Sequence, residues 1–162
     1  MHLITEEFHL LGDQFVTRNA PFRPPWAVAE QSFVQTCDHC GKCVDACPQR
    51  VLVYGRGDYP EIDFSKGGCT FCGECSLACE PGGLHPPDSH PWNLRAFIAN
   101  TCLANRGTEC NECRQSCPVE AISFRPQVGN ESVPILEEML CNGCGACVSA
   151  CPALAINVYR LT

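Results

Sequence analysis

The chain is 162 residues long, carries a formal net charge of −7 and contains 16 cysteines. An acidic chain is poorly suited to binding nucleic acid or an anionic membrane face, and its charge favours a partner with a basic patch. The high cysteine content would be typical of a disulfide scaffold in a short secreted protein, and that alternative requires an export signal.

The N-terminus lacks the pattern of an export signal. Residues 1–18 contain no basic segment followed by an apolar core and no cleavage site of small residues, and residues 1–30 contain no twin-arginine pair. No apolar run approaches the roughly 20 residues that span a bilayer. We therefore expect a cytoplasmic protein, in which thiols stay reduced and metal clusters can be installed.

Residues 1–32 are predicted to form an N-terminal extension ahead of the first cysteine run. Four apolar residues recur there at the spacing of one helix face: Ile4, Phe8, Leu11 and Phe15. This helix would pack on the rest of the chain or dock on a partner, and the pattern leaves both open. The prolines between residues 21 and 25 end any such helix, and Trp26 is predicted to be a packing anchor in an extended segment.

All 16 cysteines fall into four runs of four. The runs are Cys37, Cys40, Cys43, Cys47; Cys69, Cys72, Cys75, Cys79; Cys102, Cys110, Cys113, Cys117; and Cys141, Cys144, Cys147, Cys151. Three runs have two, two and three residues between successive cysteines, and a proline follows each fourth cysteine directly or one residue later. This is the bacterial ferredoxin pattern for a 4Fe-4S cluster, in which each iron takes one thiolate. The sequence therefore predicts four 4Fe-4S clusters as cofactors.

Structural zinc is the main alternative metal, because paired Cys-x-x-Cys motifs also bind zinc. Zinc sites use two such pairs separated by a spacer, whereas here three cysteines follow at short intervals and a fourth lies one helical turn beyond. Glycines that would let the backbone approach an anionic cluster accompany this spacing, namely Gly41, Gly73, Gly143 and Gly145. Both the spacing and the glycines favour iron–sulfur clusters.

In two-cluster ferredoxins the fourth cysteine of a run binds the cluster of the other run. The same crossing predicts four ligand sets: Cys37, Cys40, Cys43 with Cys79; Cys69, Cys72, Cys75 with Cys47; Cys102, Cys110, Cys113 with Cys151; and Cys141, Cys144, Cys147 with Cys117. These are called the first, second, third and fourth set.

The two double runs predict two modules in place of the single domain that the length suggests. Residues 33–83 would form the first module, 84–91 a Pro/Gly-rich linker, and 92–162 the second module. We expect an α+β fold of tandem bacterial-type double-cluster ferredoxin modules with pseudo-two-fold symmetry, short helices and small two-stranded sheets. Modules of this size need metal to supply their core, so metal binding and folding should be coupled.

Alternating apolar residues predict the strands around the clusters. In the first module we expect a hairpin of residues 51–54 and 61–64, with Tyr54, Ile62 and Phe64 packing over the clusters. In the second module we expect a strand at 92–98, a hairpin of 121–124 and 133–136, and a closing strand at 155–159.

The third run departs from the pattern at one place. Seven residues separate Cys102 from Cys110, where the other runs have two. An insertion there would bulge the loop around one corner of the cluster. We therefore predict that the third-set cluster is more exposed to solvent and more labile to oxidation than the other three.

Several segments together resemble the NapF family, the ferredoxin-type proteins of periplasmic nitrate reductase systems. They are Arg23-Pro24-Pro25-Trp26, the run from Cys69 to Cys79, Pro91-Trp92-Asn93-Leu94, and Cys102-Leu103-Ala104 with its long spacer. The resemblance covers nearly the whole chain. It implies a cytoplasmic accessory protein that binds the catalytic subunit of periplasmic nitrate reductase before export and helps to mature that subunit's own 4Fe-4S cluster.

Two other functions fit the cysteine pattern. Two cluster pairs in series would serve as a polyferredoxin electron carrier between redox partners, with the acidic surface steering the encounter. A chain with an exposed apolar face would instead be a fixed subunit of a larger oxidoreductase. We expect no enzyme, because the sequence has no phosphate-binding loop and no nucleophile paired with a base.

Overall fold

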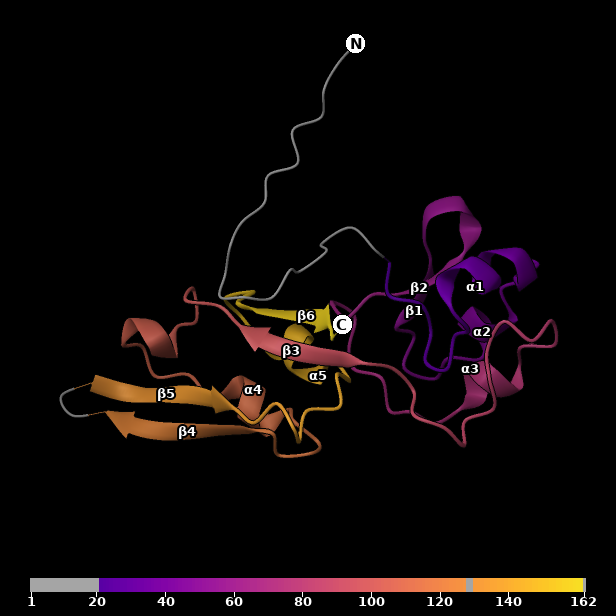
Figure 1. Ribbon diagram of the computed structural model, residues 1–162. Coiled ribbons are helices and arrows are strands. Elements are labelled where there is room, and N and C mark those ends of the chain that lie inside the picture. Colours follow the sequence, from indigo (N-terminus) through magenta and orange to yellow (C-terminus); the bar gives the residue numbers. More distant parts are fainter. Residues whose placement is uncertain (1–20, 128–129, 162) are drawn as a thin grey trace, which may run out of the picture.

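The computed structural model describes residues 21–127 and 130–161 (Figure 1). The helix predicted between Ile4 and Phe15 lies outside these residues. The described residues form five short helices: α1 (Glu30–Thr36), α2 (Lys42–Asp45), α3 (Glu74–Leu77), α4 (Glu112–Gln115) and α5 (Ala146–Ala150). They also form six strands: β1 (Leu52–Tyr54), β2 (Pro60–Ile62), β3 (Leu94–Ile98), β4 (Ile122–Gln127), β5 (Asn130–Leu136) and β6 (Ile156–Arg160). Two 3₁₀ turns complete them, η1 (Arg56–Asp58) and η2 (Ala104–Arg106).

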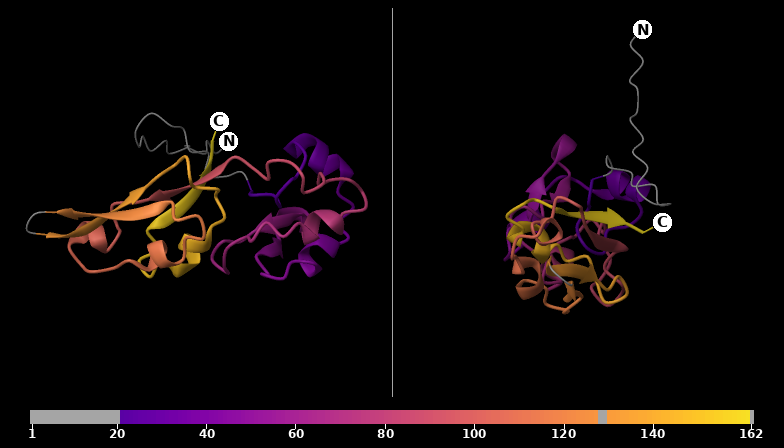
Figure 2. Two further views of the ribbon diagram at one scale, coloured as in Figure 1. Left: turned by 90° about the horizontal axis from the view of Figure 1, so that it is seen from below. Right: turned by 90° about the vertical axis from the view of Figure 1, so that its left-hand side faces the viewer.

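The elements gather in two lobes at the two ends of an elongated molecule (Figures 1 and 2). The first lobe contains α1, α2, α3, β1 and β2, and the second contains α4, α5 and strands β3 to β6. Each lobe therefore holds two of the four cysteine runs. The mixture of small sheets and short helices agrees with the expected α+β class.

Three two-stranded antiparallel sheets stand where the alternating pattern predicted strands. In the first lobe β1 pairs with β2, with Leu52 opposite Ile62. In the second lobe β4 pairs with β5, and the opening strand β3 pairs with the closing strand β6, so that Leu94 lies opposite Arg160. The predicted hairpins are therefore confirmed, and the first and last strands of the second lobe form a sheet of their own.

Each of the four helices α2 to α5 carries the third cysteine of a run and is only four or five residues long. Three of them begin after a glycine in the left-handed conformation; at Gly145, before α5, φ is 77°. That conformation costs a residue with a Cβ about 1–2 kcal/mol in free energy. In the third run this position is Asn111, with φ at −141°, so α4 is entered differently. No helix in residues 21–127 and 130–161 has the length and apolarity needed to cross a membrane.

Aromatic residues fill the space beneath the cysteine loops of the first lobe. Trp26, 5% exposed, packs with Phe33 and Leu84. The Trp26 backbone N–H donates to Pro91 O at 2.8 Å, and the indole Nε1–H donates to Ser89 O at 2.9 Å. Burial of a side chain such as Phe33 contributes about 1.5–3 kcal/mol. Trp26 is therefore the packing anchor that the sequence predicted, but it lies in a turn with φ at 63° and not in extended backbone, and it holds residues 84–91 against the first lobe.

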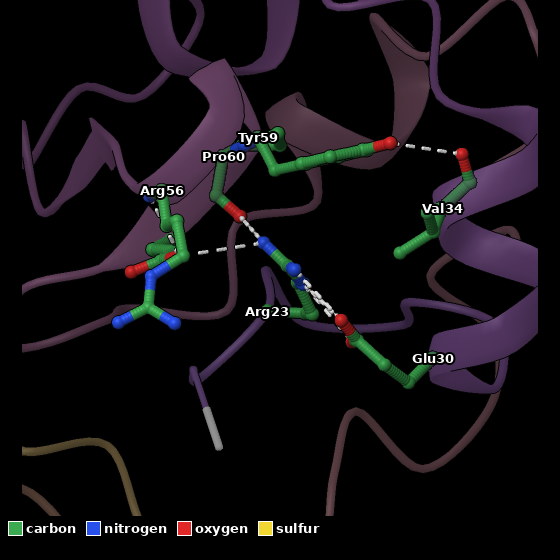
Figure 3. Close-up of polar contacts among 7 residues, drawn as sticks. Arg23, Glu30, Val34, Arg56, Tyr59 and Pro60 are labelled. Atoms are coloured by element: carbon green, nitrogen blue, oxygen red, sulfur yellow. Dashed lines mark hydrogen bonds and ion pairs between the residues drawn. The ribbon is translucent and has the colours of Figure 1, made fainter. Parts of the chain in front are cut away.

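Arg23, in the segment before α1, is held in the first lobe by ionic and hydrogen-bond contacts (Figure 3). Its guanidinium donates two hydrogen bonds to Glu30 at 2.7 and 3.0 Å and a third to Pro60 O at 3.3 Å. It also lies 5.2 and 5.1 Å from the ring centroids of Phe33 and Tyr59. These contacts account for a buried arginine and hold the pKa of the Glu30 carboxyl below its usual value.

Candidate metal-cluster sites

The thiols of the first set surround one pocket. Cys37, Cys40 and Cys43 line it together with Cys79, which comes from the second run. The rest of the lining is mostly apolar and includes Phe33, Pro60, Pro81 and Leu84. The structure thus brings a fourth cysteine to the three cysteines of the other run, as the crossed pairing requires.

The thiols of the second set surround a second pocket in the same way. Cys69, Cys72 and Cys75 line it together with Cys47 from the first run. Its apolar lining includes Trp26, Val51, Leu52, Ile62 and Phe71. Both pockets of the first lobe therefore carry four thiols each, drawn three and one from the two runs.

The second lobe repeats this crossing. Burial raises the pKa of Cys113, and the neighbouring thiols Cys102, Cys110 and Cys151 act in the same direction. Burial likewise raises the pKa of Cys144, with Cys117 and Cys141 as neighbouring thiols, and these two also lie near Cys147. The members of the third and fourth sets are thus neighbours, while their role as iron ligands stays a prediction.

Backbone amides point at sulfur atoms in three of the four sets. The N–H of Phe71 donates to Cys69 Sγ at 3.4 Å, and the N–H of Ala96 donates to Cys141 Sγ at 3.4 Å. Two fourth cysteines accept similar bonds at 3.3 Å, Cys117 from Ala121 and Cys151 from Ala155. Such donors stabilise thiolate charge and tune the potential of an iron–sulfur cluster. Within the described residues no three His, Cys, Asp or Glu side chains converge as they would around a single metal ion.

Comparison with known proteins places this arrangement in a family. Residues 36–82 and residues 107–155 each match the family of 4Fe-4S dicluster domains. The ferredoxin-type protein NapF of Escherichia coli K12 is 40% identical over 139 residues, which cover 86% of this chain and 85% of that protein. NapF of Haemophilus influenzae Rd is 42% identical over 139 residues, covering 86% of this chain and 79% of its own.

The chain belongs to the NapF family of ferredoxin-type proteins. A more distant relative is the methylamine utilization ferredoxin-type protein MauM of Paracoccus denitrificans, 32% identical over 147 residues, with 80% of this chain and 66% of that protein covered. The resemblance expected from the sequence is confirmed, and the two matched segments are 4Fe-4S dicluster domains in tandem.

Burial opposes ionisation of the thiols in this NapF-family chain. It raises the pKa of Cys43, Cys69 and Cys113 to about 11, and the pKa of Cys75 and Cys147 to about 12. Without metal these thiols keep their protons at neutral pH. A thiolate is the metal-binding form, so occupation of these sites by iron releases protons.

The prediction that the third set is the most exposed is wrong. Cys102 is 8% exposed, and Ala104 within the insertion is 1% exposed. The turn η2 (Ala104–Arg106) contacts β5, while residues 105–109 of the insertion are exposed, so the insertion reaches into solvent without exposing Cys102. The exposed thiols are Cys40 of the first set and Cys72 of the second.

The three residues predicted to cover the clusters of the first lobe behave differently. Ile62 and Phe64 are buried in the core that packs beneath the cysteine loops, as predicted. Tyr54 is 53% exposed and does not belong to that core, which corrects the prediction. Its ring instead lies over Gly41 in the loop of the first run, because a Cβ at Gly41 would collide with the phenol oxygen.

One contact had no signal in the sequence. The backbone N–H of Cys69 donates to the carbonyl oxygen of Cys144 at 2.8 Å, which joins a ligand loop of the first lobe to one of the second. The indole of Trp92 supports the same junction, because its Nε1–H donates to Asn142 O at 3.0 Å. Peptide groups make the Cys69 bond, and every residue carries these, so the residue types alone do not predict it.

Proposed function

We propose that this protein is a cytoplasmic accessory factor for the catalytic subunit of periplasmic nitrate reductase. It would bind that subunit before export and support maturation of the subunit's own 4Fe-4S cluster, by assembling the cluster or by keeping its cysteines reduced. The observation that carries this proposal is 40–42% identity to NapF proteins over 86% of the chain. The acidic chain suits docking on a basic patch of the partner.

The proposal includes four 4Fe-4S clusters held by the four crossed sets. When bound, each cluster supplies a site that accepts and returns one electron. The thiols hold the iron and the amides of Phe71, Ala96, Ala121 and Ala155 offset the thiolate charge. Apolar residues such as Trp26 and Phe33 keep water from the inner side of the pockets. We propose no catalytic site, so any substrate chemistry belongs to the partner.

The second candidate is an electron carrier that serves redox partners without forming a complex with the precursor. The observation that favours it is the exposure of Cys40 and Cys72, which lets an electron donor approach a ligand sulfur of the first lobe directly. Under this alternative the clusters survive many cycles of reduction and oxidation, whereas a factor that donates iron loses them to its acceptor.

The test is anaerobic co-purification from cells that make the tagged protein. We expect the leader-bearing cytoplasmic precursor of the catalytic subunit to co-purify, and the exported mature enzyme not to. In a strain without this protein, the catalytic subunit should contain less iron. Absence of any complex with the precursor, together with normal iron in the catalytic subunit, would overturn the maturation function and leave the carrier.

A further inference from the structure

The ligand loops of the second and fourth sets meet at the boundary between the lobes. Cys69 and Cys144, one from each set, are joined by the 2.8 Å backbone hydrogen bond from N–H to carbonyl oxygen. Beside it Gly68 lies so close to α5 that a Cβ at this position would stand 2.7 Å from the Cβ of Ala146 and 2.8 Å from its Cα. The two loops are therefore in backbone contact, without a layer of side chains or water between them.

Aromatic side chains hold the loops in this position. Trp92 lies edge-on to Phe64, with ring centroids 6.1 Å apart, and to Phe71, at 5.3 Å. The same indole donates its hydrogen bond to Asn142 O, two residues before Cys144. Phe64 itself covers Gly145 so closely that no side chain fits there. The junction is thus packed from both lobes, and its geometry is fixed.

Within each lobe the two sets are also neighbours. Helices α2 and α3 contact each other and carry Cys43 of the first set and Cys75 of the second. Helices α4 and α5 contact each other and carry Cys113 of the third set and Cys147 of the fourth. Together with the junction, these contacts order the sets along the molecule as first, second, fourth and third.

We propose that the four sets form one continuous electron relay, in which the Cys69–Cys144 junction is the step between the lobes, and not two independent two-cluster units. Clusters held by the thiols of the four sets would supply one-electron transfer between neighbouring sets, with no bond made and no proton moved. A low-potential one-electron donor supplies the electron at one end and a one-electron acceptor takes it at the other. The relay goes beyond the proposed maturation function and rests on cluster occupancy alone, without any partner.

The test compares two alanine variants of the full-length protein, purified without oxygen. Gly68→Ala places a methyl group against the Ala146 backbone and has to push the loops apart. Gly83→Ala is the control for an added methyl group, because its Cβ would make only ordinary contacts, 3.5 Å from Phe33 and 3.9 Å from Cys79 Sγ of the first set, and Gly83 takes no part in the Cys69–Cys144 junction. Neither glycine has a positive φ, so neither change strains the backbone by itself.

Iron and sulfide assays first establish that the clusters are present. Flash photoreduction with less than one electron per chain, followed by rapid freezing and electron paramagnetic resonance, then shows where the electron resides. In the wild type and in Gly68→Ala we expect the electron to reach the same final distribution among the clusters. In Gly68→Ala the approach to that distribution should be several-fold slower, and in Gly83→Ala it should be unchanged.

If Gly68→Ala loses iron, the measurement on the wild type alone tests the relay. One continuous relay gives a single equilibrium distribution whichever lobe captured the electron, whereas two isolated units give two populations that persist. Two persistent populations, or an unchanged rate in an iron-replete Gly68→Ala protein, overturn the relay and leave the maturation function intact. A preparation without iron overturns both the relay and the cofactor on which the maturation function depends.

Discussion

In the first lobe, the fourth cysteine of a run lines the pocket of the other run and not that of its own. Cys79 is close in sequence to Cys75, but it lines the pocket of Cys37, Cys40 and Cys43. Burial raises the pKa of Cys43, and its neighbour Cys79 adds to this rise. The fourth cysteine therefore links each run to its neighbour, so that loss of one residue should damage a site many residues away in the sequence.

We predict that Cys79→Ala removes the first-set cluster and spares the second. Anaerobic alkylation of the native variant, mapped by mass spectrometry, should label Cys37, Cys40 and Cys43, whose iron would be lost. Cys69, Cys72 and Cys75 should stay protected by their iron. Cys47→Ala is the reciprocal control and should expose the latter three. Labelling of Cys69, Cys72 and Cys75 in Cys79→Ala would show that the crossed pairing is wrong.

We also predict that Arg23→Ala destabilises the first lobe by about 1–2 kcal/mol, since it removes charge-assisted hydrogen bonds to a half-exposed carboxylate and the contacts with two rings. Arg23→Lys should not restore this stability, because a lysine lacks the planar fork. The measurement is the denaturant midpoint of the far-ultraviolet circular dichroism under anaerobic conditions. Arg56→Ala is the control, an exposed arginine drawn near Arg23 in Figure 3, and it should leave the midpoint unchanged.

At the scale of elements, the insertion of the third run is anchored to the second lobe through its first turn. The turn η2 places Ala104 in the interior and contacts β5. In the first lobe Cys40 is exposed, whereas Cys102 and Cys113 of the third set are buried. The order in which the clusters are attacked from solvent should follow this difference.

We predict that mild oxidation destroys the first-set cluster before the third-set cluster. Aliquots taken during titration with a small soluble oxidant, alkylated and mapped, should show label at Cys40 earlier than at Cys110. The second set, with its exposed Cys72, provides the comparison and should follow the first. Label that appears first at Cys110 would mean that the insertion opens in solution.

These elements also show which features of the fold can be predicted from the sequence. The strands β1 to β6 were predictable, because apolar residues such as Leu94 and Ala96 alternate with exposed ones at the period of a half-buried strand. The burial of Ala104 in the insertion was not predictable, because it accompanies a contact between η2 and β5, which are distant in sequence. The Cys69–Cys144 bond was not predictable either, since backbone atoms make it.

At the scale of the whole molecule, the core of the first lobe extends into the second, which also has core clusters of its own. Leu94 and Trp92 at the start of the second lobe, and Val148 on α5, pack with Phe64 of the first. The two halves match dicluster domains separately, but this core makes each half a support for the other. The contact of Phe64 with Gly145 is the point at which this dependence can be measured.

We predict that Gly145→Ala accelerates cluster loss in denaturant more than Gly82→Ala does. Both glycines have a left-handed φ, 77° and 82°, so both changes cost about 1–2 kcal/mol in backbone strain. Gly82 has nothing within 4 Å of its Cβ position, whereas a Cβ at Gly145 collides with the ring of Phe64. The difference between the two rates, followed by the visible absorbance of the clusters, therefore reports the contact between the lobes.

A double-mutant cycle separates that contact from any direct effect on the ligand loop. Phe64→Ala alone should accelerate cluster loss, because it leaves a cavity in the shared core. The double variant Phe64→Ala/Gly145→Ala should lose less stability than the sum of the losses in the two single variants. The difference should be about 1 kcal/mol or more, because the collision is gone. Strict additivity would mean that Gly145 acts only within its own loop, and the lobes would then have to be held together by Trp92 and the Cys69–Cys144 bond.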